Sequence, residues 1–430
     1  MNKSMFLNVF KGEEAYLLHN TLYGTMIRAA CDITKSIVDN LEKDGFIDYT
    51  EDNEFHDALK SSKMVVEKDI NETNLLNYYF STVDSNILGL TLIVTRQCNF
   101  RCVYCYEKFV NESMSKEIYE DILKAIKKEV ESKGFRVLTV SFFGGEPMLE
   151  YEAICSFIEE LNELADELEI KVLGTMTTNG YLLNLERFVR LVKLGVTSYQ
   201  ITIDGLEENH NKNRFLAGGG GSWKEIVKNV KKTKECDEQF IITIRINFDA
   251  SSLKGFEEFI EFISLNFADD DRYFVHFEAI KKLGGLNDDE LETAENEAES
   301  VGHMTSFARG KGMNISAYGI SPFSRICYAA KNNNYIIDTD GTLMKCTVDI
   351  DGLSNKIGKL TKSGFEIESH KICNWTSYNL LDECKNCKIL PLCFGRQCPI
   401  AMNGMRMHNS EHCENIKNIY ESSVRTIAII

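Results

Sequence analysis

Three cysteines share one short run of this chain: Thr95-Arg-Gln-Cys98-Asn-Phe-Arg-Cys102-Val-Tyr-Cys105. Intervals of three and then two residues supply three thiols from a single loop. An iron–sulfur cube has four irons, so three thiolates leave one iron without a protein ligand. A pure electron carrier gains nothing from such an iron, whereas a catalyst needs it to bind a reactant. The alternative, a zinc site, usually pairs two Cys-x2-Cys units or adds histidines, and no histidine lies between His56 and His210.

The motif resembles that of the radical S-adenosylmethionine (SAM) enzymes, whose unligated iron binds the amino and carboxylate groups of SAM. The resemblance implies a catalytic, SAM-binding [4Fe–4S] cluster held by Cys98, Cys102 and Cys105. Tyr104 matches the aromatic position of the family motif, which lies near the adenine.

Length and composition restrict the class of protein. A chain of 430 residues predicts two or three domains, and 43% hydrophobic with 26% charged residues indicates a soluble globular protein. No run of 18 apolar residues occurs, and the first residues lack the apolar core of a signal peptide. We therefore expect a cytoplasmic protein with no membrane partner. The formal charge of -17 argues against a nucleic-acid partner, which would require basic patches.

Alternating strand and helix patterns follow from about residue 86. The expected strands are 88–95, 137–143, 172–177, 199–204, 241–248 and 273–277, and helices are expected near 118–134, 185–194, 223–234 and 256–264. Six β/α steps predict an α/β fold, an incomplete, TIM-like (β/α)6 barrel over residues 86–314. Ligands of such sheets bind at the C-terminal strand ends, where the cysteine loop begins.

Glycines and polar residues follow the later strands. After the second strand stands Gly144-Gly145-Glu146-Pro147, in which two glycines allow a close backbone approach and Glu146 offers a carboxylate to an ammonium group. In radical SAM enzymes this motif grips the amino group of SAM. By the same resemblance, further contacts with SAM or substrate are expected at Thr178, Asn179, Asp204, Arg245 and Asn247.

The segment after the fourth strand carries two further features. Asp204-Gly205 followed by His210 and Arg214 resembles the peptide-modifying branch of the family, although His210 by itself predicts an ordinary surface histidine. The glycine-rich run 217–222 lacks the Lys-Ser/Thr ending of a phosphate-binding loop. We expect a flexible loop there, with Ser222 capping the next helix.

The chain has 14 cysteines, which in the cytosol are better explained as metal ligands than as disulfides. Eight of them fall near the C-terminus, and seven form a pattern: Cys327, Cys346, Cys384, Cys387, Cys393, Cys398 and Cys413. This pattern is similar to the SPASM domain of radical SAM enzymes that modify ribosomal peptides or proteins. One departure is visible, because four residues rather than three separate Cys393 from Cys398.

The SPASM resemblance implies two auxiliary [4Fe–4S] clusters in residues 315–430. One would be fully ligated by Cys384, Cys387, Cys393 and Cys413. The second would be held by Cys327, Cys346 and Cys398 and would have an open iron. The number of cysteines offers an alternative. Two complete cubes need eight thiolates, and Cys373, the eighth cysteine of this region, could be the fourth ligand of the second cluster.

Residues 1–85 predict a small α/β unit. A hairpin is expected around residues 11–13, a helix from Asp32 to Gly45, a short helix at 55–60 and a strand at 64–66. This order resembles the winged-helix-like, RRE-type domains that bind leader peptides in peptide-maturation systems.

Together these resemblances imply a maturase of a ribosomal precursor peptide that is related to the anaerobic sulfatase maturases. The leader of the precursor would bind the N-terminal domain, and its Cys-containing core would enter the barrel. SAM and three [4Fe–4S] clusters would be its cofactors, and a flavodoxin- or ferredoxin-type protein its reductant. The expected reaction cleaves SAM to a 5′-deoxyadenosyl radical and forms a thioether, as in sactipeptide and ranthipeptide maturation.

Three alternatives remain open for this chain. They are formylglycine formation as in sulfatase maturases, carbon–carbon crosslinking of a peptide, and a multi-cluster electron-transfer protein. The N-terminal extension of about 85 residues counts against the sulfatase alternative. So does the absence from residues 328–340 of the further cysteine that sulfatase maturases place shortly after the first one of the pattern.

Overall fold

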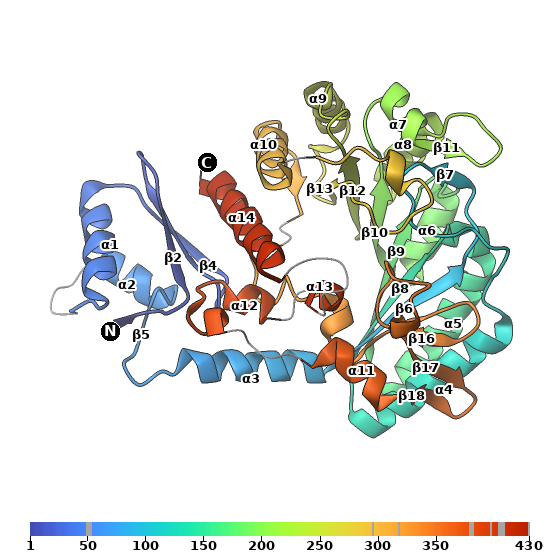
Figure 1. Cartoon of the computed structure of the whole chain (residues 1–430), viewed down its shortest axis with the longest axis horizontal. Coiled ribbons are helices and arrows are strands. Elements are labelled where there is room, and N and C mark those ends of the chain that lie inside the picture. The colour runs from blue at the N-terminus through green and yellow to red at the C-terminus, as the bar shows by residue number, and fades with distance from the viewer. Residues whose placement is uncertain are drawn as a thin grey trace. The chain divides into compact units, whose positions relative to one another are not determined.

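The computed structural model describes residues 1–48, 54–294, 296–316, 319–377, 382–395, 398–402 and 409–428. The chain divides into two compact units (Figure 1). The first unit comprises Met1–Asp84, Ala317–Lys331 and Asn374–Ile430, and the second comprises Ser85–Ser316 and Asn332–Cys373. No helix within the described residues is long and apolar enough to cross a membrane.

Six parallel strands form the centre of the second unit (Figure 1). They are β6 (Ile87–Thr95), β8 (Val137–Gly144), β9 (Lys171–Thr178), β10 (Val196–Thr202), β12 (Ile241–Phe248) and β13 (Tyr273–Ala279). Each strand pairs in parallel with the next one in this order. The predicted α/β class with six β/α steps is therefore confirmed, with strand ends shifted by a few residues at most.

Helices cover one face of this sheet. They are α4 (Lys116–Lys133), α5 (Tyr151–Leu168), α6 (Leu185–Lys193), α8 (Trp223–Lys232), α9 (Phe256–Phe267) and α10 (Glu297–Gly310). The strand residues that face them are apolar: the Phe142 ring contacts Phe157 of α5, and the Tyr199 ring contacts Phe188 of α6.

Side chains alternate along a strand, so the residues in between face the other way. Those residues are partly exposed and mostly polar, and we call them the polar sheet face: Thr139, Ser141, Thr175, Thr177, Thr243, Arg245, His276 and Glu278.

The sheet continues beyond these six strands. β14 (Asn314–Ile315) extends it past β13, and β15 (Asn334–Ile337) pairs in parallel with β6 on the other side. The antiparallel strands β16 (Thr342–Met344), β17 (Lys356–Thr361) and β18 (Gly364–Ile367) follow β15. The compact units thus divide the chain differently from the three predicted segments, because residues 332–373 hydrogen-bond onto the central sheet.

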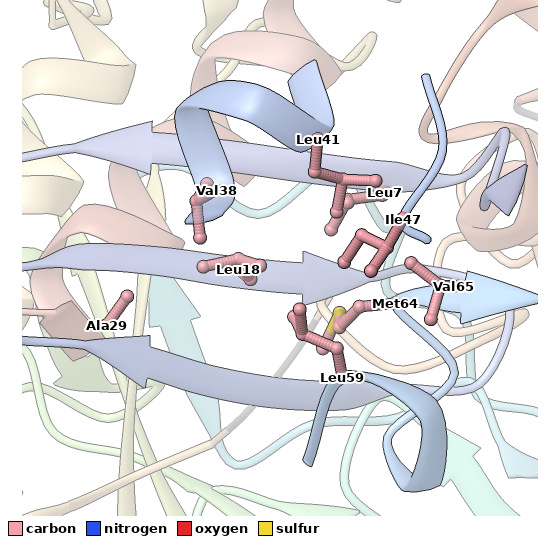
Figure 2. Close-up of a cluster of buried hydrophobic side chains, with 9 residues drawn as sticks. All are labelled: Leu7, Leu18, Ala29, Val38, Leu41, Ile47, Leu59, Met64 and Val65. Atoms are coloured by element: carbon pink, nitrogen blue, oxygen red, sulfur yellow. The ribbon is translucent and has the colours of Figure 1, made fainter. Parts of the chain in front are cut away.

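The first unit contains a three-stranded antiparallel meander. It consists of β2 (Leu7–Lys11), β3 (Tyr16–Asn20) and β4 (Thr25–Ala29), followed by α1 (Asp32–Asp44) and α2 (Glu54–Ser61). Leu7 and Leu18 of the meander join Val38 and Leu41 of α1 and Leu59 of α2 in a buried cluster (Figure 2). Two short strands, β1 (Asn2–Lys3) and β5 (Val65–Val66), pair beside it.

The other face of the meander is also buried. Phe10 and Leu17 pack against Ile416, Tyr420 and Val424 of α14 (Asn409–Ala428). A third cluster joins Leu76 and Phe80 of α3 (Glu72–Ser85) to Leu390 of α12 (Leu390–Cys393), and the short helix α13 (Pro399–Met402) lies between α12 and α14 in the chain. Chain segments far apart in the sequence therefore pack together in these apolar clusters.

The predicted hairpin, two helices and last strand of residues 1–66 are present, with one difference in detail. Cys31 rather than Asp32 occupies the N-cap position of α1, with Thr34 hydrogen-bonded to its backbone, while Gly45 ends the helix at φ 75° as expected. The sequence patterns missed β4 and α3.

His19 of β3 makes the stability of the first unit depend on pH. The ring is buried, its Nδ1 lies 2.8 Å from the Tyr420 hydroxyl, and burial lowers its pKa to about 4 from an ordinary 6.5. Between these values the unfolded chain binds the additional proton, so stability falls as the pH falls through this window. From about pH 7.5 to about pH 5 we expect a loss of roughly 2 kcal/mol.

This loss of stability at low pH should be absent from His19→Gln, because the glutamine amide can still hydrogen-bond to Tyr420 but does not titrate. Anaerobic urea unfolding of both proteins across this pH range measures the difference. Parallel pH dependences of the two proteins would contradict the assignment to His19.

Candidate active site at the ends of the parallel strands

The cysteine loop begins directly after β6 and is held by a small sheet of its own. β7 (Phe100–Cys102) pairs antiparallel with β11 (Arg214–Leu216), and Cys102 lies opposite Arg214. β11 follows the short helix α7 (Glu207–Asn213), which comes after β10. The glycine-rich run after β11 turns back, with Leu216 N donating to Gly220 O at 3.1 Å. At its start, Ala217 N donates to Asn99 O of the cysteine loop at 2.8 Å, so the run is anchored to that loop.

The pKa values of the three thiols of the loop are all raised. Burial raises the pKa of Cys98, Cys102 and Cys105, that of Cys105 to about 12, and the neighbouring thiols raise the pKa of Cys98 further. No group of three potential ligands in the described part of the chain is arranged to hold a single metal ion. In an iron–sulfur cube each thiolate binds a different iron, so the sulfurs lie farther apart than the ligands of a single metal ion. Three neighbouring thiols on one loop therefore fit a cluster, which would deprotonate them on binding.

The two glycines after β8 are required by their contact with the cysteine loop. Gly145 N donates to Thr95 O at 3.0 Å, and Glu146 N donates to Gln97 O at 2.8 Å. A Cβ on Gly144 would collide with the Thr95 carbonyl oxygen, and one on Gly145 with the Gln97 carbonyl oxygen. Gly144 also has φ 117°, which favours glycine.

Glu146 is fully buried, and its carboxylate joins two strand ends. It accepts hydrogen bonds from Thr178 Oγ1 at 2.6 Å, from Asn179 N at 2.7 Å and from Met148 N at 3.0 Å. Burial raises its pKa, against the effect of these bonds. Pro147 begins the 3-10 helix η1 (Pro147–Glu150). The carboxylate thus holds β8 to β9, and its expected contact with an ammonium group stays a prediction.

Tyr104 connects the cysteine loop to β10 and β12. Its hydroxyl donates to Asp204, which follows β10, and accepts from Asn247 Nδ2 of β12 at 3.0 Å. Asp204 Oδ1 also accepts from Asn247 N at 2.8 Å. Asn179 Nδ2 reaches the loop separately, at 2.7 Å from Asn99 Oδ1. The structure thus brings Tyr104, Asp204, Asn247 and Asn179 to the loop, as the strand-end rule predicts.

Two expectations for the segment after β10 are wrong. His210 is completely buried rather than on the surface, and its Nδ1 accepts from Asp204 N at 3.2 Å. Burial lowers its pKa well below the ordinary value. Ser222 does not cap α8, because its hydroxyl donates to Arg214 O at 2.6 Å and lies 3.1 Å from His210 Nε2. Both residues instead support the backbone around Asp204 and Arg214.

Arg245 and Asn247 of β12 were expected near the site, but the charged partner of Arg245, Glu278 on the polar sheet face, was missed from the sequence. Arg245 donates to Asn247 Oδ1 at 3.0 Å, and its guanidinium lies 4.0 Å from Glu278 of β13. Burial would raise the pKa of Glu278, but His276, Arg245 and Lys281 outweigh it and hold that pKa at about 2. The signal was available, because charged residues interrupt the apolar runs of β12 and β13.

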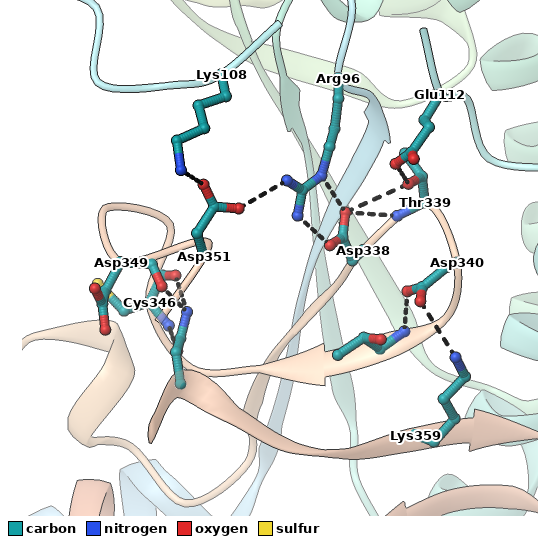
Figure 3. A network of polar contacts seen from close by, with 12 residues as sticks. Arg96, Lys108, Glu112, Asp338, Thr339, Asp340, Cys346, Asp349, Asp351 and Lys359 are labelled. Atoms are coloured by element: carbon teal, nitrogen blue, oxygen red, sulfur yellow. Dashed lines mark hydrogen bonds and ion pairs between the residues drawn. The ribbon is translucent and has the colours of Figure 1, made fainter. Parts of the chain in front are cut away.

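Ion pairs connect the cysteine loop to the segment that carries Cys346 (Figure 3). Arg96 donates two hydrogen bonds to Asp338, at the end of β15, and lies 3.2 Å from Asp351. Lys108, on the other side of the loop, also reaches Asp351 at 2.9 Å. The backbone of Cys346 bonds in both directions to the buried Asn355 amide.

The remaining predicted cluster ligands are distributed over both units. In the first unit, burial raises the pKa of Cys393 to about 11, and Cys387, Cys384 and Cys413 raise it further. Cys384 and Cys387 pack against the apolar cluster that contains Leu390 and Phe394, which flank Cys393 in sequence. Cys327 and Cys398 are half-buried in the first unit, and Cys346 is buried in the second. The alternative ligand Cys373 lies exposed on α11 (Ser369–Thr376).

The fold and the cysteine loop together define the class of protein. Residues 92–263 match the family model of the Radical SAM superfamily, so this part of the chain is a radical SAM domain. The sequence is 25% identical over 371 residues to a cysteine-type anaerobic sulfatase-maturating enzyme of Clostridium novyi (strain NT), covering 77% of this chain and 94% of that protein. It is 28% identical over 220 residues to GTP 3′,8-cyclase of Campylobacter jejuni subsp. doylei, covering 48% and 62% respectively.

Two solved structures share the fold. Native anSMEcpe with bound AdoMet and the Cp18Cys peptide superposes with a TM-score of 0.58 at 18% identity, covering 80% of this chain and 98% of that one. Streptococcus suis SuiB bound to the precursor peptide SuiA superposes with a TM-score of 0.53 at 15% identity, covering 94% and 97%. The predicted radical SAM fold and the relationship to sulfatase maturases are confirmed.

The glycine contacts predict a specific defect. Gly145→Ala drives a methyl group into the Gln97 carbonyl, and overpacking of this kind costs about 1–3 kcal/mol. The loop of Cys98 must then shift, so we expect anaerobically reconstituted protein to lose iron from this site. The matched control is Gly310→Ala, because a Cβ there meets no atom within 4 Å. Equal iron content in the two variants would contradict the account.

Proposed function

We propose that this protein is a radical SAM maturase that forms a thioether within a ribosomally synthesised peptide. The observation that carries the proposal is the three-cysteine loop at the end of the first parallel strand, against the Gly144–Gly145 backbone and the Asp204–Asn247 pair. Cys98, Cys102 and Cys105 would hold the SAM-binding [4Fe–4S] cluster. When bound, that cluster supplies the electron that splits SAM into methionine and a 5′-deoxyadenosyl radical.

The chain's own residues would bind and orient the reactants. The backbone of Gly144 and Gly145 and the side chains of Thr178 and Asn179 are proposed to line the SAM site. The polar sheet face offers hydroxyls for a peptide backbone, which presents a donor and an acceptor at nearly every residue. Arg245 and the ionised Glu278 add opposite charges that can orient it.

The reaction balances as follows. One hydrogen atom would leave a peptide carbon for 5′-deoxyadenosine, and one proton would leave the cysteine thiol as the carbon–sulfur bond forms. An auxiliary cluster, when bound, would accept the remaining electron. Cys384 and Cys387 pack against the cluster of Leu390 and Phe394 that flanks Cys393, which supports one auxiliary site at Cys384, Cys387, Cys393 and Cys413. We assign Cys327, Cys346 and Cys398 to a second, and a flavodoxin- or ferredoxin-type protein as the external reductant.

The first unit supports a peptide as the substrate. The match to SuiB covers 94% of this chain, and the uncovered 6% is shorter than residues 1–84, so the likeness extends into this segment. That structure was solved with its precursor peptide. We therefore propose that residues 1–85 bind the leader of the precursor, in the cytoplasm where it is synthesised.

Formylglycine formation is a second candidate function. The sulfatase-maturating relative from Clostridium novyi is covered over 94% of its length, which favours this candidate at the level of sequence. The N-terminal extension and the SuiB-like fold favour a peptide maturase. The modified product distinguishes the two.

SAM cleavage tests the radical chemistry. Reduced, anaerobic protein with SAM should release 5′-deoxyadenosine, and Cys98→Ala should lower that release to background because the cluster loses a ligand. The matched control Cys31→Ala removes an exposed thiol far from the loop in sequence and should retain release. Absence of release from the unaltered protein would leave only the electron-transfer alternative.

Mass spectrometry of a co-expressed cysteine-containing precursor tests the bond formed. A thioether removes two hydrogens per crosslink and protects one thiol from alkylation. Loss of two hydrogens with every thiol still alkylated would indicate a carbon–carbon crosslink instead. Loss of a cysteine sulfur with a new aldehyde would establish formylglycine formation and contradict the thioether proposal.

A further inference from the structure

Arg214 is a buried cation beside the cysteine loop. It is 6% exposed, starts β11 and lies opposite Cys102 in the β7–β11 pair. Its Nη1 donates to the Tyr104 hydroxyl at 2.8 Å, and its guanidinium carbon lies 5.7 Å from the centre of the Phe100 ring. Its Nε is buried and has no hydrogen-bond partner in the described structure. One donor of this side chain is therefore unused.

The charge of Arg214 is not neutralised by an ion pair. No carboxylate among the described residues lies within 4.0 Å of its guanidinium, although Asp204 is a neighbour in the same network. The oxygens of Asp204 accept instead from Tyr104 and Asn247. A buried charge without a partner costs several kcal/mol. An anion at this place would therefore stabilise the fold.

Cys102 is the cluster ligand that faces this charge most directly in the backbone register. It lies opposite Arg214 in the antiparallel β7–β11 pair, where directly opposed side chains lie on the same face of the sheet, and its thiol is half-buried. Arg214 is thus placed to favour anionic sulfur at Cys102.

We propose that Arg214 is the buried counter-charge of the cluster held by Cys98, Cys102 and Cys105, with its Nε–H donating to a sulfur at Cys102. The inference rests on the proposed cluster at these cysteines. One electron from the external reductant increases the negative charge of the cluster, and a fixed cation in a poorly solvated site stabilises that charge. Arg214 therefore raises the reduction potential and makes the cluster accessible to the reductant.

The test is an EPR-monitored redox titration of the full chain without SAM. The Cys98→Ala/Cys102→Ala/Cys105→Ala variant, titrated in parallel, provides the background of the other clusters. In Arg214→Gln we expect at least a tenfold lower ratio of reduced to oxidised cluster at a fixed potential, about 59 mV for one electron. Arg214→Lys keeps the charge and should stay closer to the unaltered protein.

Lys212→Gln is the matched control, because it removes a positive charge two residues away at an exposed position, where solvent screens it. An unchanged potential in an Arg214→Gln protein that retains its iron would overturn the proposal. So would an unchanged potential combined with weaker SAM binding, which would place Arg214 on SAM rather than on the cluster.

If Arg214→Gln does not retain the cluster, Arg214→Lys decides. A charge role predicts restored iron content and a potential near that of the unaltered protein, whereas loss of the cluster from both variants would assign Arg214 a packing role and overturn the proposal. Failure of the proposed function is distinguishable, because the unaltered protein would then show no EPR signal beyond the triple-cysteine background.

Discussion

The site depends on the backbone after β6 being held between the ends of the neighbouring strands. The amides of Gly145 and Glu146 bond to the Thr95 and Gln97 carbonyls, β7 pairs with β11, and Tyr104 bonds to Asp204. Each contact comes from a different element. Three cysteines on a flexible loop would ligate a cluster but could not place it, whereas these contacts fix the loop relative to β8, β10 and β12 before any cofactor binds.

The fold was largely predictable because its signals are local. Apolar residues repeat at strand or helix spacing within each element, and Gly134 ends α4 with φ 73°, as its place in the sequence predicts. The strand-end rule then placed Gly144, Asp204 and Asn247 beside the cysteine loop. The buried networks were less predictable. His210 and Arg214 have ordinary neighbours in sequence, and their environment arises only when β11 folds back onto β7, more than 100 residues earlier.

Backbone pairing between distant segments also explains why the compact units differ from the segments predicted from the sequence. Cysteine spacing groups residues 315–430 as one segment, but hydrogen bonding does not follow cysteine spacing. β15 continues the central sheet because its backbone fits beside β6, where Gly89 leaves room for the Asn334 side chain. Asp338 then meets Arg96 (Figure 3). Cys346 is consequently part of the unit that carries the three-cysteine loop, and its position is coupled to the loop of Cys98.

The central claim is that one iron of the cluster at Cys98, Cys102 and Cys105 has no protein ligand and binds SAM. Electron–nuclear double resonance on the reduced protein, with SAM isotopically labelled at its amino nitrogen and carboxylate, measures this directly. The account predicts hyperfine coupling from both labels to the cluster. Retention of the cluster without coupling from either label would contradict it.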